Sequence, residues 1–472
     1  MKPSTPEVST PLAREGTPVR LSAAGSRRAS GRTVAQAASR LRGDLWGPFD
    51  AVAAATAVVL AHRLSPVFLG VLLGPQTLRI AAAHAIFFVL IAYAVGLYDW
   101  NVLTRRGLIL RRGVIAAATA TVLTLAFQYF VFYQPIGRRI TLFTMVLTAL
   151  LVLLPRYAVW RVLQLRPRRL LFVGESPLGA TTVASLEKDL HRAYEVVGTW
   201  RSADEGDLVE ACQALDVDEI VLPLDAERVK DLMPSVLRCL PLGCRARSVA
   251  DFHEDAFRSV PVEHVSADWL LSGGLDTSNH LVEVLKRLAD ALLALALLVV
   301  TLPVTLLTAL LVRLQGDGPV FYTQVRLGRH ERPFRILKFR TMRVDAEADE
   351  PRWASGDDPR ATRLGRLLRR TRIDELPQLA NIVLGHMSFV GPRPERPEFA
   401  AQLEQSIPFY AWRHMVRPGL TGWAQINYPY GSSIEDARRK LEFDLYYIRH
   451  FSLLTDVVIV LRTVTAAMHG GR

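Results

Sequence analysis

The sequence is poor in cysteine and has no metal-binding cysteine pattern. Its three cysteines among 472 residues show no CxxC spacing: Cys212, Cys239 and Cys244. We therefore expect reduced, buried thiols that act as small hydrophobic residues in a cytosolic domain. Zinc-finger, RNA-recognition and other nucleic-acid-binding patterns are absent as well. Nucleic acid is for that reason the weakest candidate for a partner, and we expect none.

The first 44 residues lack hydrophobic periodicity. They are rich in Ser, Thr, Pro, Ala and Arg, a composition typical of a disordered basic tail at 1–44. No apolar core follows within the distance that a signal peptide requires, and no cleavage pattern is evident. We therefore expect a cytoplasmic tail rather than a secretory signal.

Positive charge and hydrophobic residues are both in excess. The formal net charge is +12 and 50% of the residues are hydrophobic. The isoelectric point is near 9.9 and the mean hydropathy is +0.19. A chain this apolar is expected to contain several membrane segments. Its basic character indicates an anionic partner, either an anionic membrane face or phosphorylated substrates.

Hydrophobic segments fill the region 45–165. Each approaches the roughly 20 residues that cross a bilayer, although the first is marginal in length. Arginines cluster before the first segment, between the second and third, and after the fourth. The positive-inside rule therefore predicts a four-helix transmembrane bundle with both ends in the cytoplasm. Buried helices of a soluble protein are the alternative. The segments lie at 46–62, 80–98, 113–133 and 140–160.

Short apolar segments alternate with helical ones from 166 to 275. This alternation predicts parallel strands joined by helices, hence a small Rossmann-like α/β domain. In its first turn Gly174 and Gly179 are in place, but Ser176 replaces the glycine that lets a backbone approach a pyrophosphate, and Pro177 follows. We therefore expect no nicotinamide cofactor and predict a structural or regulatory module. The expected strands lie at 171–174, 196–200, 219–224 and 244–249.

A fifth hydrophobic run, 286–312, contains Pro303. It is long enough to cross a bilayer, but a crossing would carry everything after it out of the cytoplasm. Basic residues flank both of its ends and favour the cytoplasm. Because proline bends a helix, we predict a re-entrant helix that breaks at Pro303 and returns to the cytoplasmic face. A kinked transmembrane span is the alternative.

Reactive side chains are concentrated in the stretch 371–394, TRIDELPQLANIVLGHMSFVGPRP. Asp374 and Glu375 precede a proline, so Asp374 is predicted to be the N-cap of a helix that runs to about Val383. Paired carboxylates, a helix N-terminus and fixed guanidinium groups are the components of metal-assisted phosphoryl transfer. A capped helix in a basic, solvated segment is the alternative. The guanidinium groups belong to Arg363, Arg366, Arg369, Arg370, Arg372 and Arg393.

Four motifs carry a resemblance to a known family: KFRTM (338–342), DELPQL (374–379), MSFVGPRP (387–394) and RPGLTGWAQ (417–425). With these motifs in this order, residues 280–472 resemble the catalytic domain of bacterial sugar transferases, the monotopic phosphoglycosyl transferases. The whole chain is similar to the large WbaP-like members. The resemblance implies a membrane protein of mixed α and α/β class. Its parts would be a four-helix transmembrane bundle, a Rossmann-like domain, and an α+β catalytic domain with a re-entrant helix and interfacial helices.

The resemblance also implies a reaction. A hexose-1-phosphate passes from a UDP-sugar to polyprenyl (undecaprenyl) phosphate, with release of UMP, as the first membrane step of exopolysaccharide or O-antigen-type glycan assembly. Asp374 would be the nucleophile that carries the phosphosugar, and Glu375 would be a ligand of Mg²⁺. Phosphate and nucleotide would be bound by Lys338, Arg340, Arg369, Arg393, Arg417 and Asp444.

The implied partners are the UDP-sugar, polyprenyl phosphate and the lipid bilayer, with a second copy of the chain and polysaccharide assembly proteins as further candidates. The implied location is the bacterial inner membrane, with several passes and the catalytic domain on the cytoplasmic face. The sequence departs from the family pattern at His386, where many members have an acid, and at Tyr428-Pro429, where others have Gly-Arg. We interpret His386 as loop structure. The sugar and the oligomeric state stay open.

Two other functions fit parts of the sequence. A membrane-anchored nucleotide-sugar dehydratase would also place a doubly wound domain after four spans, but the missing glycine and the lack of a convincing YxxxK pair disfavour it. A non-catalytic scaffold of a polysaccharide assembly system is the third class. The intact Asp374–Glu375 pair and its arginines disfavour that interpretation.

Overall fold

The computed structural model divides into two compact units, one within 1–89 and 96–252, the other within 90–95 and 253–472. The basic tail predicted at 1–44 lies outside the described residues. The structure describes residues 46–64, 75–98, 106–132, 137–163, 167–190, 193–201, 206–223, 226–262, 265, 280–316, 318–343, 360–429, 431 and 433–468.

Four long helices open the described chain, close to the four predicted segments. Three of them, α3, α5 and α6, are long and apolar enough to cross a membrane. In the described residues the fourth such helix is α12, which belongs to the second unit. The first predicted span, α2, is not among them and stays a prediction; it has 18 residues and carries Asp50, His62 and Arg63. The helices are α2 (Trp46–Arg63), α3 (Pro75–Ala94), α5 (Arg106–Phe132) and α6 (Arg138–Leu163).

A buried ion pair joins α2 to α6. Two nitrogens of Arg156 each donate to an Asp50 oxygen at 2.7 Å, and both side chains are fully buried. The hydroxyl of Tyr98 donates to the same carboxylate at 2.9 Å. A buried charge is tolerated only when it is paired and hydrogen-bonded. This pair therefore explains how α2 packs with a carboxylate on its inner face.

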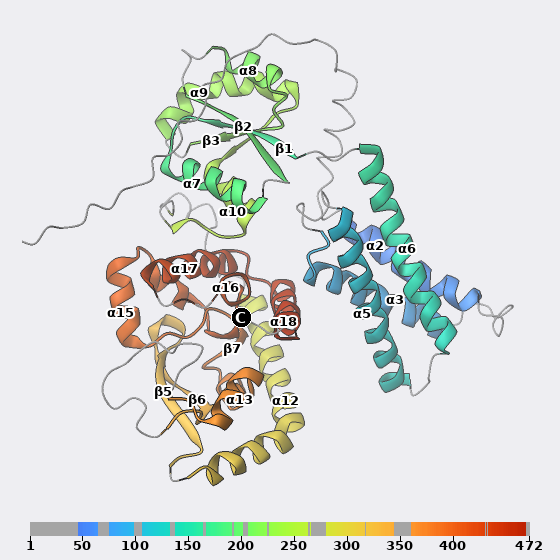
Figure 1. Cartoon of the computed structure of the whole chain (residues 1–472), viewed down its shortest axis with the longest axis vertical. Helices are drawn as coiled ribbons and strands as arrows, with labels where there is room; N and C mark the ends of the chain where they lie inside the picture. Colours follow the sequence, from blue (N-terminus) through green and yellow to red (C-terminus); the bar gives the residue numbers. More distant parts are fainter. Residues whose placement is uncertain are drawn as a thin grey trace, which may run out of the picture. The chain divides into compact units, whose positions relative to one another are not determined.

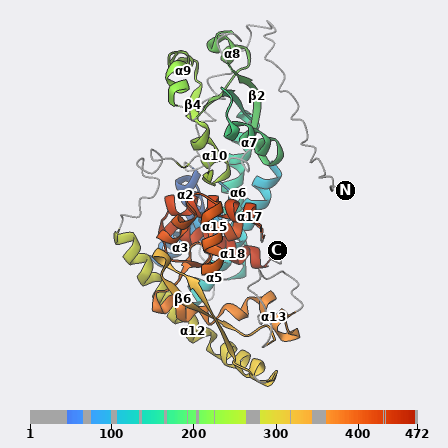
Figure 2. The ribbon, with the colours of Figure 1, turned by 90° about the vertical axis from the view of Figure 1, so that its left-hand side faces the viewer.

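The middle of the chain forms one parallel sheet with the strand order β2-β1-β3-β4. All four strands predicted from the sequence are present. Figures 1 and 2 show α8 and α9 on one side of the sheet and α7 and α10 on the other. None of the three cysteines forms a disulfide, and all three are buried, as predicted. The strands are β1 (Arg168–Val173), β2 (Tyr194–Trp200), β3 (Glu219–Leu222) and β4 (Arg245–Ser248); the helices are α7 (Pro177–Ser185), α8 (Leu208–Ala214), α9 (Ala226–Cys239) and α10 (Val249–Phe257).

The first turn of this sheet is closed by its own side chains. Ser176 is the N-cap of α7 and accepts a hydrogen bond from the amide of Gly179 at 3.0 Å, with Pro177 at the first helical position. One of the amides that would bind a phosphate is therefore already occupied. The absence of nicotinamide binding stays a prediction, and this capping is its structural basis.

The second unit combines a long apolar helix with a small α+β fold. A hairpin of β5 and β6 is antiparallel, and β7 pairs with β8 in parallel. The elements are α12 (His280–Leu314), β5 (Phe321–Leu327), β6 (Pro333–Phe339), α13 (Arg363–Thr371), α14 (Gln378–Leu384), β7 (Ser388–Val390), α15 (Pro397–Ser406), β8 (Gly419–Thr421), α16 (Trp423–Asn427), α17 (Ile434–Arg449) and α18 (Leu453–Met468).

Helix α12 is continuous through Pro303, so the two separate half-helices predicted from the sequence are not present as such. Figure 1 shows that α12 changes direction along its length. Two local features favour a bend: Pro303 has no amide to donate, and the hydroxyl of Thr301 donates to the carbonyl of Leu297 at 2.7 Å. The path of α12 relative to a membrane stays a prediction.

Candidate active site

Asp374 and Glu375 lie in a 3₁₀ turn, Ile373–Glu375, between α13 and α14. The prediction that Asp374 is a helix N-cap is wrong, because α14 begins at Gln378 and Pro377 occupies the N-cap position. Without an amide, Pro377 cannot donate to Ile373 in the α-helical pattern, and the turn closes instead through Leu376 N to Ile373 O at 3.1 Å. The turn places the two carboxylates side by side ahead of the helix.

Three cations converge on one oxygen of Glu375. Lys338 Nζ donates to Oε1 at 3.0 Å, and guanidinium nitrogens of Arg372 and Arg393 lie 3.7 and 3.9 Å from the same oxygen. Burial would raise the pKa of Glu375, but these cations, Lys338 foremost, lower it to about 2. Glu375 is therefore a carboxylate at any physiological pH. The predicted residues Lys338, Arg393 and Glu375 are thus brought together.

Asp374 is buried, with only 7% of its surface exposed. Its Oδ1 is buried without a hydrogen-bond partner. Burial raises the pKa of this carboxyl and the charge of Glu375 raises it further, whereas Lys338, Arg369 and Arg372 lower it. Asp374 is therefore a buried carboxylate whose ionised form is disfavoured by burial and by the charge of Glu375, and one of its oxygens makes no hydrogen bond.

Arg369 and Lys338 are positioned by neighbours that the sequence pattern did not reveal. Arg369 donates from Nε to the hydroxyl of Thr341 at 3.0 Å. Asn381 fastens α14 to β6: its Oδ1 accepts from Leu337 N at 3.0 Å, and its Nδ2 donates to Arg335 O at 2.8 Å. This contact holds Lys338 on β6 opposite Glu375. Asn381 occupies a buried polar position, and no spacing rule distinguishes it from a surface asparagine.

The loop that carries Arg393 is fixed by close backbone packing. A Cβ atom on Gly391 would lie 2.2 Å from Arg417 O, and one on Gly419 would lie 2.2 Å from Gly391 N. A Cβ on Gly422 would lie 2.2 Å from Gly391 O. These distances explain the glycines of the GPRP and RPGLTG motifs, because only glycine allows two backbones to approach so closely.

Asp444 contacts the loop that carries Arg393 indirectly, through Arg413. Its carboxylate pairs with Arg413 at 2.9 Å, and Arg413 donates to the main-chain carbonyl of Arg393 at 3.2 Å. Burial raises the pKa of Asp444 to about 6, against the lowering effect of Arg413. The sequence missed Arg413, which is buried and has no motif of its own. The structure gives Asp444 a partner that orients Arg393.

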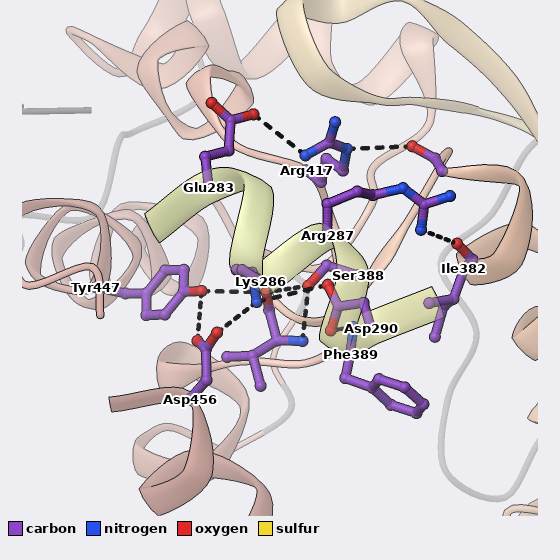
Figure 3. A network of polar contacts seen from close by, with 12 residues as sticks. Glu283, Lys286, Arg287, Asp290, Ile382, Ser388, Phe389, Arg417, Tyr447 and Asp456 are labelled. Carbon is purple, nitrogen blue, oxygen red and sulfur yellow. Dashed lines mark hydrogen bonds and ion pairs between the residues drawn. The ribbon is translucent and has the colours of Figure 1, made fainter. Parts of the chain in front are cut away.

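A second polar network ties α12 to the same loop (Figure 3). Lys286 Nζ lies 2.5 Å from Asp456 Oδ2 on α18 and 3.8 Å from Asp290. The hydroxyl of Tyr447 donates to Asp456 Oδ1 at 2.8 Å and lies 3.2 Å from Val390 O. Val390 ends β7 and directly precedes Gly391. The first half of α12 is therefore anchored in the fold that holds Arg393.

Two predicted binding residues are engaged away from the carboxylate pair. Arg340 donates to the carbonyls of Val312 and Gly316 at 3.3 and 3.5 Å, at the end of α12. Arg417 donates to Glu283 at 3.2 Å and to Gly385 O at 3.3 Å. The contacts of both residues are structural in this conformation, and their roles in phosphate or nucleotide binding stay predictions.

The two departures from the family pattern have ordinary structural places. His386 is exposed in the turn after α14, with its ring 5.9 Å from that of Phe334. Tyr428 donates from its hydroxyl to Asp436 at 2.9 Å, at the start of α17. Neither contact reaches the carboxylate pair.

The carboxylate pair suits a hard divalent cation that also binds substrate. No group of three His, Cys, Asp or Glu side chains able to hold a metal occurs in the part of the chain that the structure describes. Mg²⁺ typically needs only one or two carboxylates, with water and substrate phosphates completing its coordination. Asp374 has an unpartnered oxygen, and the three cations all approach Oε1 of Glu375. The residues therefore fit Mg²⁺ held together with a phosphorylated substrate.

Comparison with known proteins assigns the second unit. Residues 281–470 match the family model described as bacterial sugar transferase. The chain is 37% identical over 272 residues to a UDP-N-acetylgalactosamine-undecaprenyl-phosphate N-acetylgalactosaminephosphotransferase of Aeromonas hydrophila, covering 57% of this chain and 63% of that protein. It is 34% identical over 313 residues to a UDP-glucose:undecaprenyl-phosphate glucose-1-phosphate transferase of Escherichia coli (strain K12), covering 63% of this chain and 67% of that protein.

A shorter relative matches almost throughout. The exopolysaccharide production protein PSS of Rhizobium leguminosarum bv. phaseoli is 40% identical over 195 residues, which cover 40% of this chain and 98% of that protein. The match thus spans nearly the whole of a short relative but only about three fifths of the Aeromonas protein. The chain belongs to the bacterial sugar transferase family.

Proposed function

We propose that the chain transfers a hexose-1-phosphate from a UDP-sugar to polyprenyl phosphate and releases UMP. The observation that carries the proposal is Asp374, a buried carboxylate with an unpartnered oxygen beside a carboxylate held by three cations. The names of two relatives support the substrate class, since both name undecaprenyl phosphate, one with N-acetylgalactosamine and one with glucose. Because the two names give different sugars, the proposal does not specify which hexose is transferred.

In the first step, an oxygen of Asp374 forms a bond to the phosphorus that carries the sugar. The bond from that phosphorus to the oxygen bridging the two phosphates breaks, and its electron pair leaves with UMP. Lys338, Arg369 and Arg393 are placed to neutralise phosphate oxygens while charge moves to the leaving group. Mg²⁺ held at Glu375 would supply further neutralisation of phosphate charge.

In the second step, a phosphate oxygen of polyprenyl phosphate attacks the same phosphorus. The bond from phosphorus to Asp374 breaks, and the carboxylate is restored with its electron pair. Splitting the transfer in two lets one site receive a soluble nucleotide sugar and then a lipid phosphate. The products are UMP and a polyprenyl diphosphate sugar, which suits the first membrane step of exopolysaccharide or O-antigen-type glycan assembly.

The packing of α12 supports an active site at the cytoplasmic face of the inner membrane. In the first half of α12, Ala294 packs in the main core of the second unit. Near the end of α12, Val312 packs with Phe339 and Leu368 of the same unit. The segment between them exposes apolar side chains on both sides of Pro303, for example Val300 at 73% and Leu306 at 61%. A helix anchored at both ends to one compact unit favours a re-entrant path, because a crossing would separate its ends by the bilayer.

Cysteine labelling is expected to find both ends of α12 on one side of the membrane. With Leu281→Cys and Leu314→Cys, both exposed positions, a membrane-impermeant thiol reagent should label each variant only from the cytoplasmic side. The native cysteines are buried and give little background. Gly137→Cys, in the connection before α6, is the matched control and should label only from outside. Labelling of the two α12 positions from opposite sides would establish a transmembrane span instead.

Glu375→Gln is expected to weaken the Mg²⁺ dependence of UMP release. The variant loses one carboxylate of the proposed metal site, so the Mg²⁺ concentration for half-maximal rate should rise by roughly 10-fold or more. A titration with Mg²⁺ measures this shift. Glu398→Gln, an exposed carboxylate on α15, is the control and should behave like the unchanged chain. An unaltered Mg²⁺ response in Glu375→Gln would remove Glu375 from the metal site.

The same variant should change the pH profile. After burial, the charge of Glu375 is the largest cause that raises the pKa of Asp374. A nucleophilic carboxylate must be deprotonated, so activity rises with pH through that pKa. Replacing Glu375 by neutral glutamine should lower the pKa of Asp374. The acidic limb of the plot of UMP release against pH should therefore move to lower pH.

One assay separates the proposed function from its alternatives. Membranes that contain the chain are supplied with a UDP-sugar and Mg²⁺, with and without polyprenyl phosphate, and UMP is measured. A transferase releases UMP continuously only when polyprenyl phosphate is present. A dehydratase would alter the sugar and leave the diphosphate intact, and a scaffold would do neither. Either of the last two results would refute the proposal.

A further inference from the structure

The main part of the second unit begins at His253, well before residue 281, where the match to the family model starts. Ahead of α12, the structure describes residues 253–262 and 265 of this part, which we call the leading segment. Its apolar side chains are buried: Val260 and Val262 are each 2% exposed. Buried side chains are typical of a segment that belongs to a folded unit, not of a linker.

The main chain of the leading segment is hydrogen-bonded to α16 and α17. Nε1 of Trp423, the first residue of α16, donates to the carbonyl of Arg258 at 2.9 Å. The amide of Val260 donates to the carbonyl of Glu442 on α17 at 3.0 Å. Arg258 has a φ of 55°, in the left-handed region that glycine normally occupies. Because such a conformation persists only where its surroundings fix it, these contacts define the path of the segment.

The valines of the leading segment complete a hydrophobic cluster of the second unit. Tyr410, at the start of the 3₁₀ turn Tyr410–Met415, lies in this cluster and is 2% exposed. Truncation of a buried side chain leaves a cavity toward which its neighbours partly relax. The position of Tyr410 therefore depends on the packing of the leading segment. The cluster joins Val260, Val262 and Val265 to Tyr410, Leu441 and Leu445, among others.

Tyr410 is connected to the loop of Arg393 through Arg413. Nη1 of Arg413 donates to the hydroxyl of Tyr410, and Nη2 donates to the main-chain carbonyl of Arg393 at 3.2 Å. Burial raises the pKa of Tyr410 to about 12, against the lowering effect of Arg413. The phenol is therefore neutral, and its oxygen accepts the hydrogen bond. Since Arg413 is only 6% exposed, a shift of Tyr410 is passed through a buried guanidinium to Arg393.

We propose that the leading segment is a positioning element of the active site and holds Arg393 in place through Tyr410 and Arg413. This inference rests on the proposed function, in which Arg393 neutralises phosphate charge. A guanidinium nitrogen of Arg393 lies 3.9 Å from Oε1 of Glu375, beside the reacting carboxylate. Misplacement by about 1 Å at a reacting centre lowers rates roughly 100-fold. Residues ahead of the region that the family model matches thus set the geometry of the first step.

The test follows the first step alone. The purified full chain, in phosphatidylcholine vesicles without polyprenyl phosphate, receives a UDP-sugar and Mg²⁺, and UMP is measured over the first turnover. The amount of UMP counts the competent sites, and its rate reports how well each site is arranged. Val262→Ala should lower the rate roughly 10-fold with an unchanged amount of UMP. Val236→Ala, a valine of α9 that is also 2% exposed, is the matched control and should alter neither quantity.

Tyr410→Phe tests the connection itself. The variant keeps the ring and removes only the hydroxyl that Arg413 contacts. It should lower the rate by a factor similar to that of Val262→Ala, again with an unchanged amount of UMP. Val262→Ala added to Tyr410→Phe should lower the rate no further, because both substitutions act on Arg393 by one route and their effects are then not additive in free energy.

The proposal fails if Val262→Ala releases UMP as fast as Val236→Ala, or if the effects of Val262→Ala and Tyr410→Phe multiply. It fails equally if Val262→Ala lowers the amount of UMP and leaves the rate unchanged, because the segment then only supports folding. Should Val262→Ala not fold, an unaltered rate in Tyr410→Phe overturns the proposal by itself. A chain without substitutions that releases no UMP would instead contradict the proposed function, and the inference with it.

Discussion

Asp374→Asn is expected to abolish sugar-phosphate transfer. Loss of a covalent nucleophile typically lowers turnover by roughly 10⁴-fold or more, and an amide is a far weaker nucleophile than a carboxylate. Folding should be unaffected, because asparagine has nearly the same shape and removes a buried charge. Burial already raises the pKa of Asp374, so the ionised carboxylate is costly to the folded state and the neutral amide relieves that cost.

The variant is checked by UMP release and by thermal unfolding in parallel. The midpoint of unfolding should equal or exceed that of the unchanged chain while UMP release falls to background. Glu398→Gln serves again as the exposed control. Turnover close to the original in Asp374→Asn would rule out the covalent role of Asp374, whatever the stability of the variant.

Gly391→Ala is expected to damage both stability and transfer. The added Cβ would meet Arg417 O at 2.2 Å and Gly419 N at 3.0 Å, and both are main-chain atoms of a tightly packed turn. Forced overpacking of this kind typically costs about 1–3 kcal/mol. The loop that carries Arg393 must shift, and misplacement by about 1 Å at a reacting centre lowers rates roughly 100-fold.

Gly107→Ala is the matched control for that substitution. Gly107 is exposed near the start of α5, and a Cβ there would have nothing within 4 Å. This control should keep its activity and unfold at the original temperature or slightly above it, because alanine favours a helix. An unfolding midpoint and rate in Gly391→Ala equal to those of Gly107→Ala would show that the close backbone packing is not required.

The parts of the fold that repeat a local pattern were predictable from the sequence. The four strands of the parallel sheet alternate with helices, and all four appear where the apolar segments lie. The carboxylate pair and its partners Lys338 and Arg393 were predictable because their motifs are long and ordered. Residues whose role depends on tertiary contacts were not predictable from the sequence. Asn381 and Arg413 position the site through buried hydrogen bonds that no spacing reveals.

One error has a definite physical cause. Asp374 was expected at a helix N-cap, but the missing amide of Pro377 converts the start of that helix into a 3₁₀ turn. Helix α2 is not among the helices that length and composition mark as candidate spans, and its place in a membrane stays a prediction; its Asp50 forms a fully buried pair with Arg156. A motif does not fix the contacts of each of its residues. Arg340 of KFRTM and Arg417 of RPGLTGWAQ were predicted to bind phosphate or nucleotide, but in the structure both side chains donate to main-chain carbonyls.

The most direct test of the account is capture of the sugar phosphate on the protein. The full chain in membranes is given a UDP-sugar labelled in the phosphate that carries the sugar, with Mg²⁺ and no polyprenyl phosphate, and the label is located by peptide mass analysis. We predict one phosphosugar per active site, attached to Asp374, with an equal amount of UMP released and full discharge on addition of polyprenyl phosphate. UMP release that requires both substrates together, with no label on Asp374, would contradict the account.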